Sequence, residues 1–264
     1  MSPVPLLSIV AYRHQRLARV PLLGPTLIVV QQGQKRLLTA NGETVCRAGQ
    51  WIALPGGQEV ELINQPVDGG CYRALCLGQP QPWLERFLLH WGERLPAPPW
   101  PGETVFTPDT RAAQALADLQ ALQATPDDAL AGAHAEHVWQ GLMLALAARR
   151  QAWPLFTPPR QGTREQVLAL FTFDPGRDWN PREMANRLAM SEATLRRRLA
   201  AQSTSFSALL ADVRMERALA LINGGSSQPL GDIAHACGYQ SPSRFAAAFR
   251  RRFGLTPSAL RATG

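Results

Sequence analysis

The stretch DIAHACGYQSPSRFAAAFRRRFG, residues 232–254, places four arginines among alanines, phenylalanines and small polar residues. Its pattern predicts a short helix, a tight turn at Gly238 and a second helix that Ser241 caps. Phe245 and Phe249 recur at helical spacing, so they mark the buried face of that second helix. The stretch therefore predicts a helix-turn-helix unit, the kind of motif that places its second helix in a DNA groove.

A related stretch, WNPREMANRLAMSEATLRRRLA, occupies residues 179–200. Asn180 is the predicted cap of its first helix and Ser191 that of its second, while Leu195 and Leu199 correspond to the two phenylalanines of the later copy. Between the copies, SFSALLADVRMERALALINGG predicts a long amphipathic helix that holds the units at a fixed separation. Two such units enter successive major grooves when they lie about 34 Å apart. The predicted units cover about residues 181–201 and 230–252.

These residues resemble the DNA-binding domain of the AraC/XylS family of transcriptional regulators. The resemblance covers roughly the last hundred residues and is carried by RMERALALI (214–222) and IAHACGYQSPSRFAAAFRRRFGLTPSALR (233–261). Leu260 departs from the pattern, since an aromatic residue is usual there. The resemblance implies binding to double-stranded promoter DNA at two adjacent half-sites and, usually, activation through contact with RNA polymerase. The matching positions are Gly238, Tyr239, Ser241, Phe245, Phe249, Phe253, Gly254 and Pro257.

The positive charge of the chain lies in the same region. Residues 160–264 contain 15 arginines and 8 acidic residues, which accounts for the whole formal net charge of +7, whereas the 12 basic and 12 acidic residues of 1–159 cancel. A basic domain beside a neutral one predicts a polyanionic partner for the basic domain alone. An arginine-rich coding bias would charge both halves, so it does not explain the asymmetry.

The outward faces of the two second helices predict the DNA contacts. With Leu195 and Leu199 buried, a rotation of about 100° per residue turns Arg197 to the opposite face, where an arginine fork can bind guanine. In the later unit Ala247 stands where the family often has an arginine, so we expect the first unit to read sequence and the second mainly to grip phosphate. The alternatives are a merely solvated basic face and, for Arg198, a pair with an acid.

The residues predicted to read bases are Ala193, Thr194, Arg196, Arg197, Ser243 and Arg244, with Arg244 the strongest base-reading candidate of the second unit. Those predicted to contact phosphate are Ser191, Arg198, Ser241, Arg250, Arg251 and Arg252.

The first part of the chain has the pattern of a small β-barrel. Short β-rich runs separated by Gly and Pro cover about residues 20–80, and Asn41–Gly42 predicts a hairpin turn. The stretch GQWIALPGGQEVELIN, residues 49–64, matches the second cupin signature, but Val60 stands where that signature has its metal-binding histidine. None of the five histidines lies within residues 20–80. The pattern predicts a cupin-like barrel with no metal site and no cofactor.

Helical periodicity replaces the strand pattern over about residues 82–151. Residues 108–124 and 126–151 predict an antiparallel helical hairpin whose second helix carries an apolar stripe. That stripe either packs on the strand domain or forms a dimer seam, and the sequence favours neither. The segment 156–163 is short and rich in proline and polar residues, so it predicts the linker between domains.

The predicted fold is therefore α+β with two domains. Residues 1–155 are a cupin-like barrel with a helical hairpin, which the family resemblance implies is an effector-binding and dimerisation domain. Residues 164–264 are an all-α double helix-turn-helix domain. Together they predict a cytoplasmic, sequence-specific transcriptional regulator, an activator and homodimer without catalytic activity that responds to a small-molecule effector. The sequence does not single out the residues of the effector pocket.

Two other classes of function stay open. A cupin-type enzyme fused to a DNA-binding tail needs at least three converging metal ligands, whereas His134, Glu136 and His137 lie on one predicted helix after the barrel. The third class is a DNA-binding protein that needs no ligand. The four cysteines show no CxxC pair, which predicts reduced thiols in a cytoplasmic protein. The apolar runs are too short to span a bilayer, and no signal peptide is evident, so no membrane association is expected.

Overall fold

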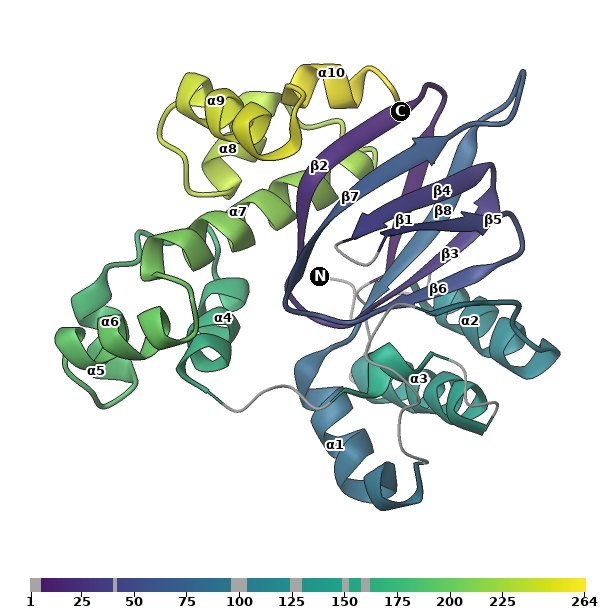
Figure 1. Cartoon of the computed structure of the whole chain (residues 1–264), viewed down its shortest axis with the longest axis horizontal. Helices are drawn as coiled ribbons and strands as arrows, with labels where there is room; N and C mark the ends of the chain where they lie inside the picture. The colour runs from purple at the N-terminus through teal and green to yellow at the C-terminus, as the bar shows by residue number, and fades with distance from the viewer. Residues whose placement is uncertain (1–5, 40–41, 96–103, 124–129, 149–151, 158–161) are drawn as a thin grey trace.

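The computed structural model describes residues 6–264 apart from 40–41, 96–103, 124–129, 149–151 and 158–161. A β-sheet domain is followed by a helical domain (Figure 1), so the predicted α+β class is confirmed. The strands are β1 (Leu6–Ala11), β2 (Gln15–Leu22), β3 (Thr26–Gln32), β4 (Gln34–Thr39), β5 (Gly42–Arg47), β6 (Trp51–Leu54), β7 (Gln58–Gln65), β8 (Tyr72–Gly78) and β9 (Thr104–Phe106).

Two antiparallel sheets face each other in the first domain. One has the strand order β1-β8-β3-β6-β9 and the other the order β2-β7-β4-β5. Side chains from both sheets, among them Leu17, Val30 and Leu62, meet between them in one core. The strands extend beyond the predicted range of 20–80, because β1 and most of β2 precede it and β9 pairs with β6 from a position after the first helix.

The predicted hairpin joins β4 and β5, in which Thr39 is the cross-strand partner of Gly42. Its turn at residues 40–41 lies outside the described residues.

Helices cover the outer face of the five-stranded sheet. They are α1 (Gln81–Trp91), the 3-10 helix η1 (Gly92–Arg94), α2 (Thr110–Gln123) and α3 (Ala131–Ala148), with α2 packed along α3 as the predicted hairpin. On α3, Trp139, Leu142 and Met143 are fully buried, in one core with Val29 and Leu75 of the sheet. The apolar stripe of α3 therefore packs on the strand domain, which is the first of the two alternatives that the sequence left open.

A second 3-10 helix, η2 (Trp153–Phe156), includes the first residue of the segment predicted as the linker. Its four side chains are buried, and Trp153, Leu155 and Phe156 lie in the same core as α3, so Phe156 belongs to the barrel domain and not to the linker predicted at 156–163. The composition of this proline-rich segment is typical of a loop, but burial of its aromatic and leucine side chains stabilises its packing against the barrel domain. The next helix begins at Thr163.

The helical domain contains both predicted helix-turn-helix units. Its elements are α4 (Thr163–Phe173), α5 (Pro181–Arg187), α6 (Glu192–Ala201), α7 (Phe206–Asn223), α8 (Leu230–Ala236), α9 (Pro242–Phe253) and α10 (Pro257–Arg261). The first unit is α5–α6 and the second is α8–α9, and α7 runs between them as the central rod (Figure 1).

The two units have different cores. The first half of α7 forms a core with α4, α5 and α6, which Leu23 touches from the barrel side. The second half of α7 packs with α8, α9 and α10, and this core is continuous with the interior of the barrel. Both α7 and α9 lie against β2 (Figure 1), so the second unit rests directly on the barrel edge.

Candidate nucleic-acid interface

The predicted caps orient the second helix of each unit. The Ser191 hydroxyl accepts a hydrogen bond from the backbone N–H of Thr194 at 3.2 Å, and Ser241 accepts one from that of Arg244 at 3.4 Å. Asn180 caps the preceding helix α5 in the same way. Helix N-termini carry partial positive charge, so both serines, predicted phosphate contacts, lie where an anion is favoured.

The tight turns of the two units share a backbone conformation. Ala189 and Gly238, which occupy equivalent positions in the two copies, have positive φ angles of 52° and 77°. A Cβ on Gly238 would lie 2.5 Å from a guanidinium nitrogen of Arg214. That guanidinium donates to the carbonyl oxygens of Pro175 and Arg177, so glycine leaves room for an arginine that ties α7 to the α4–α5 loop.

Helix α6 turns its arginines away from its own core. Leu195 and Leu199 are 1% exposed, whereas Arg196 and Arg197 are exposed. Neither arginine pairs with an acidic residue in the described part of the chain. Of the predicted base-reading residues, Ala193, Arg196, Arg197, Ser243 and Arg244 are exposed, and Thr194 is half-buried.

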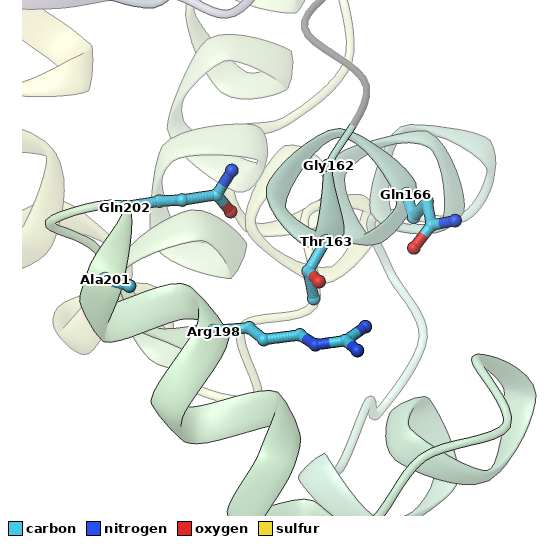
Figure 2. A pocket seen from close by; sticks show the side chains of 6 residues that line it. All are labelled: Gly162, Thr163, Gln166, Arg198, Ala201 and Gln202. Carbon is cyan, nitrogen blue, oxygen red and sulfur yellow. The ribbon is translucent and has the colours of Figure 1, made fainter.

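Arg198 takes a different direction from its neighbours. Figure 2 shows its guanidinium extended toward Thr163 in the first turn of α4, across an open pocket of about 470 Å³. The Gln202 side chain closes one side of this pocket and accepts a hydrogen bond from the backbone N–H of Arg164. Arg198 thus lies beside a helix N-terminus and off the outward face of α6, a position suited to a backbone contact rather than to base reading.

The three consecutive arginines of α9 differ in their exposure to solvent. Arg250 and Arg251 are exposed. Arg252 corrects the sequence prediction, because its side chain is 12% exposed and pairs with Asp212 of α7 at 2.9 Å and with Glu59 of β7 at 2.8 Å. In this structure Arg252 joins the two domains and does not offer its charge to phosphate.

The charged groups near Arg252 are partly shielded from solvent at the contact between the two domains. Burial raises the pKa of Asp212 above its usual value even though Arg252 lowers it. Burial, assisted by the charge of Asp212, raises the pKa of Glu216 to about 7. The position of Arg252 was readable from the sequence, since it follows Phe245 by two helical turns and so shares its inward side.

Sequence reasoning missed a further contact of the same interface. The backbone N–H of Tyr12 donates to the carbonyl oxygen of Thr263 at 2.6 Å, and the side-chain amide of Gln15 donates to the Thr263 hydroxyl at 2.6 Å. No motif or period marks Thr263, because a single polar residue after a terminal helix carries no pattern.

No group of three His, Cys, Asp or Glu side chains in the described residues is placed to hold a metal ion. Val60 is 2% exposed in the barrel core, where the cupin signature would have a histidine. The four cysteines are free thiols, and burial raises the pKa of Cys46 and of Cys237 to about 11, which disfavours reactive thiolates. Within the described ranges, no helix combines the length and the apolar character that crossing a bilayer requires.

Two family models match the chain. An AraC-like ligand binding domain matches residues 17–143, and a helix-turn-helix domain matches residues 184–263. The chain belongs to the AraC family. The first range covers most of the barrel and its helices and the second covers most of the two helix-turn-helix units, so the AraC resemblance inferred from the sequence is confirmed.

Similar AraC-family proteins are transcriptional regulators. The transcriptional regulator SirC of Salmonella typhimurium (strain SL1344) is 40% identical over 95 residues, which are 36% of this chain and 32% of SirC. The urease operon transcriptional activator of Escherichia coli is 35% identical over 97 residues, 37% of this chain and 32% of the activator. The chain thus matches about a third of the length of these curated relatives.

The whole fold is found in a solved structure. An apo variant of ToxT from Vibrio cholerae strain SCE256 superposes with a TM-score of 0.67 over 98% of this chain and 96% of ToxT, at 13% sequence identity. At this identity the likeness establishes the two-domain fold alone.

Proposed function

We propose that the protein is a sequence-specific DNA-binding transcriptional regulator of the AraC family. The observation that carries the proposal is the free, exposed pair Arg196–Arg197 on α6, in the domain that holds the whole net charge of +7. An arginine fork to guanine is the commonest specific contact in the major groove. The relatives that share the helix-turn-helix domain are transcriptional regulators, which supports the same function.

The two units divide the work of binding. Helix α6 contacts base edges through Arg197 and Arg196, while α9 makes fewer base contacts and binds phosphate through Arg250 and Arg251. Ala247, exposed at the centre of α9, offers no hydrogen bond to a base edge. The α7 rod sets the distance between the two units, so the site consists of two half-sites about one helical turn apart.

The barrel domain supplies regulation. We infer that it binds a small-molecule effector, as the match to an AraC-like ligand binding domain supports. The protein works as a homodimer in the cytoplasm and activates transcription through contact with RNA polymerase. It has no catalytic activity.

Selection of bound DNA from a random pool by the full chain tests the proposal. We expect one enriched motif with two half-sites, and footprinting on that motif protects two adjacent major-groove segments. Arg197→Ala removes the enrichment at one half-site and leaves the other, whereas Arg251→Ala weakens binding to all sequences alike. An unenriched pool, or a footprint confined to one groove segment, contradicts the proposal.

A further inference from the structure

A second connection, besides α7, joins the two helix-turn-helix units. The loop between α4 and α5 lies close to the end of α8, because a Cβ on Gly176 would be 3.1 Å from the carbonyl oxygen of Ala236. Gly176 is in the loop that leads into α5, and Ala236 is the last residue of α8. The first unit therefore touches the second directly, through backbone atoms.

Arg214, in the middle of α7, lies at the same junction. Its Nε donates to the carbonyl oxygen of Pro175 at 3.1 Å, and one Nη donates to that of Arg177 at 2.9 Å. The guanidinium also lies 5.9 Å from the centre of the Tyr239 ring and would be 2.5 Å from a Cβ on Gly238. One side chain thus contacts both the loop before α5 and the turn between α8 and α9.

Each of the two segments that Arg214 contacts is fixed to its own unit. On the first side, the indole of Trp179 donates to the carbonyl oxygen of Asp174 at 2.8 Å and is buried in the core that contains α4, α5 and α6. On the second side, the Tyr239 ring lies 5.5 Å from that of Phe245 in α9. Arg214 therefore links two packed units and not two loose loops.

The contacts of Arg214 depend on the shape of its guanidinium. Its acceptors are backbone carbonyl oxygens, and no carboxylate forms an ion pair with it in the described part of the chain. A guanidinium is planar and presents its donors as a fixed fork, so it can bind two carbonyl groups while it lies against a ring. A lysine ammonium is a point charge on a flexible chain and does not reproduce this arrangement.

We propose that Arg214 is a positioning residue that fixes the angle between the two units and thereby the half-site spacing that the protein accepts. The inference rests on the proposed function, because it concerns two half-sites on one duplex. Helix α7 sets the distance between the units, but each unit packs on it through a separate core, so α7 alone leaves them free to rock independently. A second connection beside the helix removes that freedom.

The spacing of the half-sites is sensitive to this angle. One inserted base pair moves the half-sites apart by about 3.4 Å and rotates one against the other by about 35°. Two units held at a fixed angle cannot follow that rotation, so one of them loses its contacts. Units released from each other can follow it, although the second unit then has a lower effective concentration at the original spacing. Loss of Arg214 should therefore lower the selectivity for spacing as well as the affinity.

Anisotropy titrations of the full chain with duplexes of altered spacing test this role. One base pair is inserted between the two half-sites of the selected motif. We expect the insertion to weaken binding of the wild type about ten-fold or more and that of Arg214→Met about three-fold or less. Both affinities are measured on one preparation, so a lower folded fraction of the variant cancels in their ratio. An insertion that weakens both proteins by the same factor, or one that the wild type tolerates, overturns the proposal.

Two further variants separate geometry from charge. Arg217→Met removes an exposed arginine of the same helix, and it should keep the wild-type loss on insertion. Arg214→Lys keeps the charge without the fork, so it should behave as Arg214→Met does. The proposal is wrong if Arg214→Lys keeps the wild-type loss. It is also wrong if Arg214→Met weakens binding at every spacing alike and reduces the salt slope by about 0.9, because Arg214 would then be contacting phosphate.

Amide hydrogen exchange of the chain without DNA distinguishes failure of this inference from failure of the proposed function. In Arg214→Met we expect exchange across residues 174–179 and 235–240 to rise about five-fold or more, and in Arg217→Met to stay at the wild-type rate. Unchanged exchange in Arg214→Met overturns the link between the units. If the chain selects no DNA motif, the proposed function fails, while the exchange measurement still supports or overturns that link.

Discussion

Arg252 and Arg251 are adjacent arginines, of which the first is held in ion pairs and the second is exposed, so replacing each by alanine gives a crossed prediction. Arg252 is 12% exposed and holds Asp212, whose side chain is 25% exposed, and Glu59, whose side chain is 43% exposed. Loss of one partner of a fully buried pair costs about 3–5 kcal/mol, whereas an exposed pair contributes about 0.2–1 kcal/mol. This half-buried site lies between those limits.

We expect Arg252→Ala to lower the free energy of unfolding by about 1–2 kcal/mol, most of it from Asp212, because solvent screens the pair with Glu59. For a chain of this length that loss corresponds to a fall in Tm of roughly 3–6 °C. Arg251→Ala, on the exposed side of α9, changes the free energy of unfolding by less than about 0.5 kcal/mol.

DNA binding should show the reverse order. Arg251→Ala lowers the affinity for every sequence and reduces the slope of log K against log salt concentration by about 0.9, the value for one lost phosphate contact. Arg252→Ala leaves that slope unchanged.

Urea unfolding and anisotropy titrations at several salt concentrations measure the two quantities on the same preparations. A double-mutant cycle with Asp212→Asn and another with Glu59→Gln separates the two partners, and the first coupling energy should be the larger. The reasoning is refuted if Arg252→Ala reduces the salt slope while leaving stability unchanged, because the side chain would then be serving phosphate.

Three further predictions follow from single positions. Arg197→Ala should reduce discrimination against a wrong base pair at its half-site by about 1–3 kcal/mol, measured by competition between selected and mutated sites. The pKa of Glu216 is about 7 in the folded state, above its usual value of 4.5, so the folded state loses stability as pH rises from 4.5 to 7. Glutamine removes that loss. Glu216→Gln should therefore stabilise the protein by roughly 3 kcal/mol at pH 8 and by less than about 1 kcal/mol at pH 5. Ala189→Gly should raise the free energy of unfolding by about 0.5–1 kcal/mol, because glycine adopts the φ of 52° without strain. Gly238→Ala should lower the free energy of unfolding by more than that, because its Cβ would collide with Arg214. Urea unfolding measures both changes.

The sequence predicted those parts of the molecule that repeat a pattern. Caps at Ser191 and Ser241 and buried pairs at helical spacing specify both helix-turn-helix units, because each signal is local and each is tied to a period or a hydrogen bond. The exposed direction of Arg197 followed from the same geometry.

The contacts between the domains could not be predicted in this way. The Gln15–Thr263 hydrogen bond joins residues 248 positions apart, and nothing local distinguishes either residue. The buried state of Lys35 was equally hidden, since a lysine among alternating polar and apolar residues is usually on the solvent face of a strand. It faces the core because the register places it opposite Asn64, and register over such distances depends on the whole sheet.

The uneven attachment of the two units has a consequence for regulation. The α8–α10 half shares its core with the barrel and is tied to it by Arg252 and Thr263, whereas the α5–α6 half has its own core and meets the barrel side through Leu23. Because α7 contributes to both cores as one helix, we expect a shift of its second half against β2 to rotate the first unit with it. Under the proposed function, we expect a ligand in the barrel to act first on the α8–α9 unit and to reach α6 through a change in the angle of α7. The helix proposed to read bases and the contacts with the barrel thus lie at opposite ends of α7.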